Sequence, residues 1–359
     1  MVFAVLPIII SLFITSLLII AVNNDPREVF ETVWEGAFRN SNSLAGVVNF
    51  WIPLALCSIG LVVTFTAGLW NIGVEGQMGI GAVFASWAAL FVVLPAPAQI
   101  LLQIVLAMLG GALWGALVGF LKTRLGVHEI FGGVALNSLA SVITIYLVTG
   151  PWSPPGGSSK QSTAPFAAHA LLTPVSTEFP VSLLMLVIVL IAFTAVVILL
   201  RGTRWGLQLK ATGKNARSAL LLGVPTTRSA ISALVVCGAL AGIAGSYRVL
   251  FTYNSLRTLV SGGIGFLALL VVLLVAVRLL WAPLIAFVFA VILGGSTRLK
   301  IALQLDQSLA GVMQGLIVLL VLLGDGVRQR WMARRAKDTP SVPEQSFQPV
   351  TPPEALPHE

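Results

Sequence analysis

The sequence predicts an all-α, polytopic membrane protein with about ten transmembrane helices. Of its 359 residues, 57% are apolar and 9% are charged, whereas about 25% of the residues in soluble domains are charged. Many apolar stretches reach the roughly 20 residues that a helix needs to cross a hydrocarbon core about 30 Å thick. Basic residues cluster between these stretches and after the last one, as in cytoplasmic loops. The formal charge of +8 therefore indicates membrane topology rather than nucleic-acid binding.

The predicted spans are apolar runs bounded by charged residues, glycine and proline. The first run lacks a basic start and a small-residue cleavage site, so we expect it to be retained rather than removed as a signal peptide. The runs lie approximately at residues 3–22, 50–67, 77–94, 99–121, 130–149, 180–200, 229–250, 262–277, 279–297 and 307–325.

Charge predicts the orientation of these spans. With the N-terminus inside, fourteen of the 21 basic residues lie on the inner side, which favours this orientation over its mirror image. Residues 23–49 and 150–179 are then the long extracytoplasmic loops. Residues 1–325 form the predicted transmembrane domain. The tail at 326–359 is predicted to be cytoplasmic, first basic and then, from Lys337, disordered, because it has too little apolar surface to fold.

Small residues at four-residue spacing predict close contacts between helices, since they let backbones approach where lipid provides no hydrophobic drive for association. Packing alone is a sufficient explanation for each stripe. The stripes are Gly111-x3-Gly115-x3-Gly119, Gly238-x3-Gly242 and Ala241-x3-Gly245.

The segment Gly68–Gln77 interrupts the apolar pattern with three glycines and three polar side chains. Irregular backbone at membrane depth is tolerated only where protein buries it or water lines it, and an ionisable residue there is a functional candidate. Trp70, Asn71, Glu75 and Gln77 are therefore candidates for a translocation path. The alternative is a short cytoplasmic turn in which Glu75 is solvated, although the segment contains no lysine or arginine.

A second polar group lies at the start of the fifth predicted span. Glu129 opens this span, and Asn137 lies about two turns within it; both are further candidates for the path. A hydrogen bond from Asn137 to a neighbouring helix is the more ordinary role. His128 has no second histidine or cysteine at ligand spacing, so we expect an ordinary loop histidine rather than a metal ligand.

The loop at 201–228 contains the signals of a short helix. Asn215 is a favourable N-cap, Ala216–Leu222 are good helix formers, and Gly223 followed by Pro225 is a stop signal.

Helical spacing places Ala216, Ala219 and Leu220 on one face of this short helix, while Lys214 and Arg217 keep it at the cytoplasmic surface. A capped basic helix of this kind suits docking into a cleft on a cytoplasmic partner. It equally suits resting on anionic lipid headgroups.

The sequence lacks the motifs of an enzyme. Gly213-Lys214 is followed by Asn215 and lacks the upstream glycine of a P-loop, so the chain is not expected to bind ATP in that way. Neither a zinc motif nor a hydrolase motif is present. Cys57 and Cys237 both lie in apolar runs, where we expect small buried side chains rather than a disulfide or metal site. If the chain takes part in transport driven by a nucleotide, another chain must bind and hydrolyse that nucleotide.

Several motifs, in this order, resemble the binding-protein-dependent ABC permeases that import simple sugars, nucleosides or branched-chain amino acids. The resemblance runs from the first span to about Asp325, and Gly68–Gln77 is similar to the N-I-G-x-E-G-Q signature of the family, closest to the nucleoside and simple-sugar branch. The supporting motifs are Glu129 with Leu136-Asn137, Gly213-x-Asn215-x2-Ser218-Ala219 with Gly223-Val224, the small residues before Ser246, and Gly263-x-Gly265-Phe266 with Pro283.

The resemblance implies a permease subunit without enzymatic activity or a cofactor of its own, in the bacterial-type cytoplasmic (inner) membrane. It implies three partners: a cytoplasmic ATPase that binds ATP, a second permease that is identical or paralogous, and an extracytoplasmic solute-binding protein. It also makes the segment at 213–223 the element that couples ATPase motion to the spans. Its expected coupling residues are Gly213, Asn215, Ala216, Arg217, Ala219 and Gly223.

The sequence departs from the family pattern at three places, and it leaves other functions open. His128, Tyr247-Arg248 and Val277-Arg278 differ from the residues expected there, which affects any substrate contact more than the coupling role. One alternative is an ion-coupled secondary transporter, for which Glu75 is nearly the only intramembrane acid. Others are a permease for branched-chain amino acids and a lipid-modifying membrane enzyme, which would need clustered polar residues at the interface.

Overall fold

The computed structural model describes residues 2–154, 161–306 and 308–338, and these are mostly helical. Within this part of the chain, β-structure is limited to one isolated bridge between Ser162 and Arg257. The helices are α1 (Val2–Ala21), α2 (Pro26–Phe38), α3 (Ser41–Thr66), α4 (Val74–Phe91), α5 (Ala96–Leu125), α6 (Glu129–Thr149), η1 (Ala168–Ala170), α7 (Leu183–Gly202), α8 (Arg204–Lys214), α9 (Ala216–Leu221), α10 (Thr226–Tyr247), η2 (Arg248–Thr252), α11 (Ile264–Leu274), η3 (Leu279–Trp281), α12 (Ala282–Ser296), α13 (Leu299–Ala302) and α14 (Ser308–Asp338).

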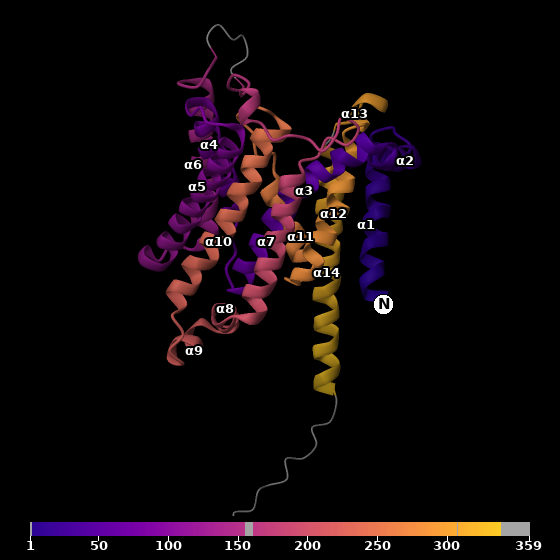
Figure 1. Ribbon diagram of the computed structural model, residues 1–359. Coiled ribbons are helices and arrows are strands. Elements are labelled where there is room, and N and C mark those ends of the chain that lie inside the picture. The colour runs from indigo at the N-terminus through magenta and orange to yellow at the C-terminus, as the bar shows by residue number, and fades with distance from the viewer. Residues whose placement is uncertain (1, 155–160, 307, 339–359) are drawn as a thin grey trace, which may run out of the picture.

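The long helices form one bundle with two distinct ends (Figure 1). The short helices α8 and α9 lie at one end, the end from which α14 also projects. The segment that follows α6 lies at the opposite end, as do α2 and α13. Helices α3, α4, α5 and α10 pack closely against one another, and α1 packs against α14. The chain is thus an all-α bundle, as the sequence predicts.

Each of the ten predicted ranges contains a helix, but the count of ten membrane spans is not confirmed. Among the residues that the structure describes, six helices are long and apolar enough to cross a membrane, or seven if α1 and α2, which meet at a 109° bend, are taken as one span. Among the rest, α11 has 11 residues and α4 begins with the polar residues of the break. The finding supports a multi-pass membrane protein.

The segment at 23–49, predicted as a loop, is mostly helical. Asp25 accepts a hydrogen bond from the Arg27 backbone N–H at 2.8 Å, and Pro26 occupies the first position of α2. Val29 and Val33 on one face of α2 are buried. The prediction failed because this helix is amphipathic rather than apolar, so a search for long apolar runs passed over it.

The last predicted span is longer than expected. Helix α14 does not end near Asp325 but continues to Asp338, through the basic part of the tail. The remainder of the predicted disordered tail, 339–359, lies outside the described residues.

The predicted small-residue stripes are confirmed as helix contacts. A Cβ atom at Gly111 would lie 2.9 Å from the Gly242 Cα atom, and one at Gly119 would lie 3.2 Å from the Ile231 Cα atom. Side chains larger than hydrogen would therefore push α5 away from α10.

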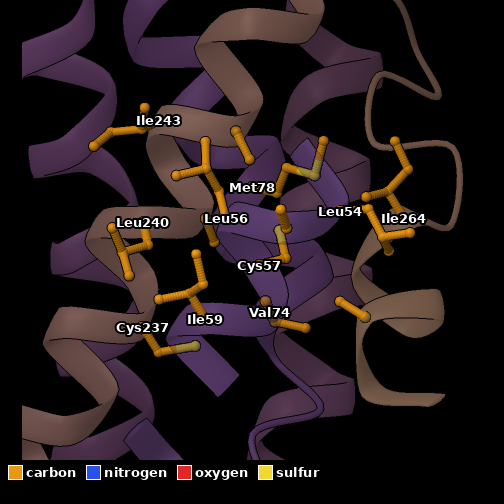
Figure 2. Close-up of a cluster of buried hydrophobic side chains, with 14 of the residues drawn as sticks. Leu54, Leu56, Cys57, Ile59, Val74, Met78, Cys237, Leu240, Ile243 and Ile264 are labelled. Carbon is orange, nitrogen blue, oxygen red and sulfur yellow. The ribbon is translucent and has the colours of Figure 1, made fainter. Parts of the chain in front are cut away.

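A central hydrophobic cluster joins α3, α4 and α10 (Figure 2). Cys57 and Cys237 are part of it; both are buried and free, as predicted. The labelled members in Figure 2 also include Leu54, Leu56, Ile59, Val74, Met78, Leu240, Ile243 and Ile264.

Candidate functional site

The break between α3 and α4 is a turn that ends one helix and starts the next. Gly68 adopts a left-handed backbone conformation with φ of 73°. The Leu69 N–H then bonds back to the Thr64 carbonyl oxygen at 2.9 Å, which satisfies a carbonyl at the end of α3. After this turn the chain reverses and α4 begins at Val74.

Two predicted site residues pair with each other inside the bundle. The Asn71 amide nitrogen donates to the Gln77 side-chain oxygen at 3.0 Å, and the Gln77 amide nitrogen donates to the Asn71 oxygen at 3.1 Å. Asn71 also donates to the Cys237 sulfur at 3.1 Å. Both amide side chains are fully buried, so the pair holds the break against α10 rather than facing an open path.

Asn137 on α6 reaches the same turn. Its side-chain oxygen accepts a hydrogen bond from the Gly76 N–H, and its amide nitrogen donates to the Ile72 carbonyl oxygen, both at 2.8 Å. These two bonds satisfy backbone groups that the break leaves without helical partners. Asn137 therefore has the helix-bridging contact that the sequence suggested as its more ordinary role.

Glu75 connects the break to a second irregular segment. Its two carboxylate oxygens accept hydrogen bonds from the backbone N–H groups of Gly263 at 2.8 Å and Gly265 at 2.7 Å. Gly262 and Gly263 both have positive φ and form the turn that starts α11. A carboxylate at a helix N-terminus is stabilised by the free N–H groups and the helix dipole. The alternative of a merely solvated Glu75 is therefore wrong.

The second irregular segment leads into a short helix. Helix α11 has 11 residues, which span about 16 Å, or half of a hydrocarbon core about 30 Å thick. Helix α11 alone is therefore too short to cross such a core. The first N–H groups of a helix have no partner within the helix, and the Glu75 carboxylate from α4 provides acceptors at this position.

Two cavities flank this glycine turn, and both are lined by Leu259, Gly262, Gly263 and Phe266. The larger has a volume of about 1140 Å³ and also contacts Trp70. The smaller, about 530 Å³, contacts Glu75 and Asn137 together with several serine and threonine side chains. The glycine turn therefore separates the two cavities, and the hydrogen bonds of Glu75 hold this turn in place.

Arg248 is a candidate site residue that was not predicted from the sequence, although it departs from the family pattern. Arg248 begins the π-helical turn η2 and lines the larger cavity. Its side chain donates to the Val260 carbonyl oxygen at 3.2 Å and to the Tyr253 hydroxyl. It is the only lysine or arginine within a predicted span, and this was the signal that could have identified it.

Glu129 lies apart from this cluster. Its carboxylate accepts a hydrogen bond from the Lys122 ammonium group at 2.5 Å, and His128 Nδ1 lies 3.6 Å from the same carboxylate oxygen. The pair joins the end of α5 to the start of α6. Glu129 is thus placed in an ion pair between two helix ends, not beside Asn71, Glu75 and Gln77.

The loop at 201–228 forms two helices, of which only the second was predicted. Asn215 caps α9 as expected, because its side-chain oxygen accepts a hydrogen bond from the Ser218 N–H at 3.0 Å. Gly223 follows with φ of 80°. Helix α8, which precedes this cap, was not foreseen.

The three residues that helical spacing places on one face of α9 differ in their exposure. Ala219 is 3% exposed and faces the protein, whereas Ala216 is exposed. Leu220, Leu221 and Leu222 project outward with exposed fractions of 61%, 84% and 83%. Helical spacing defines faces but does not say which residues the rest of the chain covers, so the burial of Ala219 was not predicted.

Gly213 forms a backbone contact between α8 and the end of α3. A Cβ atom there would lie 2.9 Å from the Gly68 nitrogen and would clash with the Thr66 carbonyl oxygen. The segment at 213–223 therefore touches the turn that leads directly to Asn71 and Glu75. Among the described residues, no group of three or more histidine, cysteine or acidic side chains could hold a metal ion.

Comparison with known proteins places the chain among transport proteins. The sequence profile of the family described as branched-chain amino acid transport system / permease component matches residues 43–322. This range includes every predicted site residue. No solved structure matches the chain significantly.

Characterised relatives cover most of the chain. The glucose ABC transporter permease protein of Haloferax volcanii is 26% identical, over 94% of this chain and 92% of the relative. The guanosine ABC transporter permease protein of Bacillus subtilis is 23% identical, over 89% of this chain and 92% of the relative. A nucleoside ABC transporter permease protein of Lactococcus lactis is 26% identical, over 74% of this chain and 76% of the relative.

Proposed function

The chain belongs to the ABC transporter permease family that matches residues 43–322, and on this premise we propose that it is the membrane subunit of an importer for nucleosides or simple sugars. The relatives named above transport glucose, guanosine or nucleosides according to their names. A permease of this family provides the pathway but does no chemistry. ATP is bound and hydrolysed by a separate cytoplasmic subunit, in a cytoplasmic membrane that this chain crosses about ten times with both termini inside.

The observation that carries the proposal is the contact between the exposed segment and the internal break. Leu221 and Leu222 project into solvent at the end of the bundle, which fits an unfilled contact with another protein. The same segment reaches the α3–α4 turn through Gly213. Motion of an ATPase bound to α9 would therefore act on the turn that holds Asn71 and Glu75. This arrangement supports a coupling role for residues 213–223, with Gly213 and Asn215 as positioning residues.

The translocation path is proposed to run beside the glycine turn rather than through the amide pair. Trp70 and Glu75 line the two cavities next to this turn. Asn71, Gln77 and Asn137 hold the break in place and act through it. Glu129 is proposed to fix the α5–α6 connection, since its carboxylate is already paired with Lys122.

Three partners follow from this proposal: an ATPase at the α9 end, a second permease that is identical or paralogous, and a solute-binding protein at the opposite end. Solute would move when the permease pair switches between two states, driven by differential contacts with the ATPase in each state.

Reconstitution tests the proposal directly. The permease is placed in proteoliposomes with its ATPase, second permease and binding protein, and uptake of labelled glucose and guanosine is followed with and without ATP. We expect accumulation only with ATP and with the ATPase present, and inhibition by vanadate. Uptake in liposomes that lack the ATPase, driven by a sodium or proton gradient, would instead establish a secondary transporter.

A further inference from the structure

The larger cavity beside the glycine turn has the dimensions of a solute site. Its volume of about 1140 Å³ slightly exceeds the range of roughly 300–1,000 Å³ that is typical of small-molecule pockets. Most of its wall is apolar or aromatic, with contributions from Phe50, Trp70, Phe266 and several leucines. The polar side chains on the wall are Arg248, Thr252, Tyr253 and Asp306.

Arg248 is fixed in this wall by aromatic and backbone contacts. Its side chain is 4% exposed, and its guanidinium carbon lies 4.5 Å from the centroid of the Tyr253 ring and 5.8 Å from that of Phe50. Two hydrogen bonds, to the Val260 carbonyl oxygen and the Tyr253 hydroxyl, set its orientation. A guanidinium group has five N–H donors in a rigid planar fork, so these two bonds leave donors for a ligand.

The charged side chains in the wall of the larger cavity have opposite signs, because Arg248 is a cation and Asp306 an anion. Glu75 lies on the other side of the glycine turn, where both of its oxygens accept hydrogen bonds, from Gly263 and Gly265. A cation and an anion that offset each other do not favour a ligand with a net charge. The site therefore fits a solute without net charge.

The wall also distinguishes between the two neutral solutes that the relatives transport. A hexose carries hydroxyl groups on all sides, and a largely apolar wall would leave most of them without hydrogen-bond partners. A nucleobase has two flat apolar faces that pack on aromatic side chains, and polar atoms only at its edge. The guanidinium fork matches an edge with a carbonyl oxygen beside a ring-nitrogen acceptor.

We propose that this cavity is the permease's own nucleoside site, in which the base lies against the aromatic wall with its acceptor edge toward Arg248. The inference rests on the proposed function, because it names the solute of that importer. The hydroxyl-rich cavity on the other side of the turn, with Ser138, Ser141 and Thr144 in its wall, is where a hexose would fit better.

The first experiment measures which solute enters. Vesicles with the complete transporter are given labelled guanosine, adenosine and glucose, with saturating binding protein. We expect ATP-dependent uptake of guanosine and no uptake of glucose above the background of vesicles without the transporter. ATP-dependent uptake of glucose alone would overturn the nucleoside site and leave the importer intact. ATP-independent guanosine uptake would overturn the importer and leave the site intact. No uptake of any of the three, with ATPase activity present, would overturn the site.

The second experiment tests whether Arg248 touches the solute. Glutamine pairs with the donor and acceptor of adenine, whereas arginine pairs with the two acceptors of guanine. We therefore expect Arg248→Gln to lower guanosine uptake by about tenfold or more and to shift the adenosine-to-guanosine ratio by about tenfold. A permease that is only destabilised would lose both solutes equally.

Arg257 provides the matched control. Its guanidinium carbon also lies 4.5 Å from the Tyr253 ring centroid, but the residue is exposed and does not line the larger cavity. Arg257→Gln should leave both uptake rates within about twofold of the parent, since exposed charges contribute little. An unchanged solute ratio in Arg248→Gln, or an equal change in Arg257→Gln, would refute a direct contact between Arg248 and the base.

Discussion

The break at 68–77 and the segment at 213–223 both contain polar residues in an otherwise apolar chain, but the first is buried and hydrogen-bonded within the chain and the second is exposed at the surface. In the break, each polar side chain finds partners within the chain: Asn71 pairs with Gln77, and Glu75 bonds two backbone N–H groups of another segment. In the second segment, the Asn215 side chain caps its own helix at the surface, and the leucines at 220–222 are exposed.

This difference teaches where the chain is complete and where it depends on another protein. Buried polar groups in a membrane protein must be satisfied internally, and those of the break find their hydrogen-bond partners within one subunit. An exposed run of leucines outside the apolar spans is stable only in contact with another surface. Gly213 is the point at which the two regions touch, and the predictions below test each region and this contact.

The largest effect is expected from Glu75→Ala, which would leave the Gly263 and Gly265 N–H groups without an acceptor. Each buried donor without a partner costs about 1–3 kcal/mol, so the loss is about 3 kcal/mol, and the temperature at which the detergent-solubilised protein unfolds should fall clearly. Glu75→Gln keeps one acceptor oxygen, so its unfolding temperature should lie between those of the parent protein and Glu75→Ala. Equal unfolding temperatures for all three proteins would show that the break does not depend on this carboxylate.

A smaller effect, confined to assembly, is expected from Leu221→Glu. The side chain is 84% exposed, so the permease should insert and fold normally, while binding of the ATPase should weaken by about 2 kcal/mol, as for a residue at the centre of an interface. Co-purification of the ATPase measures this. Leu221 is a better probe than Ala219, because a substitution of the buried Ala219 would weaken ATPase binding through misfolding as well as through lost docking.

The control for this variant is Ile301→Glu. Ile301 is 81% exposed and lies in α13 at the opposite end of the bundle (Figure 1). It should keep the ATPase bound. If Leu221→Glu also keeps it bound, α9 is not the docking element and contact with lipid headgroups becomes the better explanation.

An intermediate effect on transport is expected from Gly213→Ala. The added methyl group would force α8 away from the α3–α4 turn, and overpacking of this kind costs about 1–3 kcal/mol. Coupled uptake should fall by about tenfold while the ATPase remains bound. Gly202→Ala is the matched control, because no atom lies within 4 Å of the added Cβ; equal uptake in both variants would argue against a mechanical link at Gly213.

The smallest effect is expected at the Lys122–Glu129 pair. The Lys122 side chain is 30% exposed, so solvent weakens the interaction, and a double-mutant cycle with Lys122→Gln and Glu129→Gln should give a coupling energy of about 1 kcal/mol or less. Uptake should stay within about twofold of the parent. A selective loss of uptake in Glu129→Gln, with stability unchanged, would return Glu129 to the translocation path.

The parts of the fold that the sequence predicted are those decided by local chemistry. Asn215 caps α9 because an N-cap depends on neighbours three residues away. The stripe from Gly111 to Gly119 packs on α10 because small residues on one helix face let another helix approach closely.

The parts that were missed depend on distant contacts. Glu75 was identified as unusual, but its partners lie 188 and 190 residues away, and one sequence contains no signal that pairs them. Arg248 is visible as a charge in an apolar span, yet its aromatic surroundings depend on how Phe50 and Tyr253 are brought together. The burial of Ala219 likewise depends on tertiary packing rather than on helical spacing.

Helix α14 provides a reference point for measuring the movement of α9. Its 31 residues extend about 46 Å, roughly 15 Å more than a hydrocarbon core needs, and the excess emerges at the same end as α9 (Figure 1). The projecting part of α14 therefore lies at the same end of the bundle as the segment that we expect to move (Figure 1). A spin label near its tip and another on α9 would report, as one distance, how far each nucleotide state displaces the docking element.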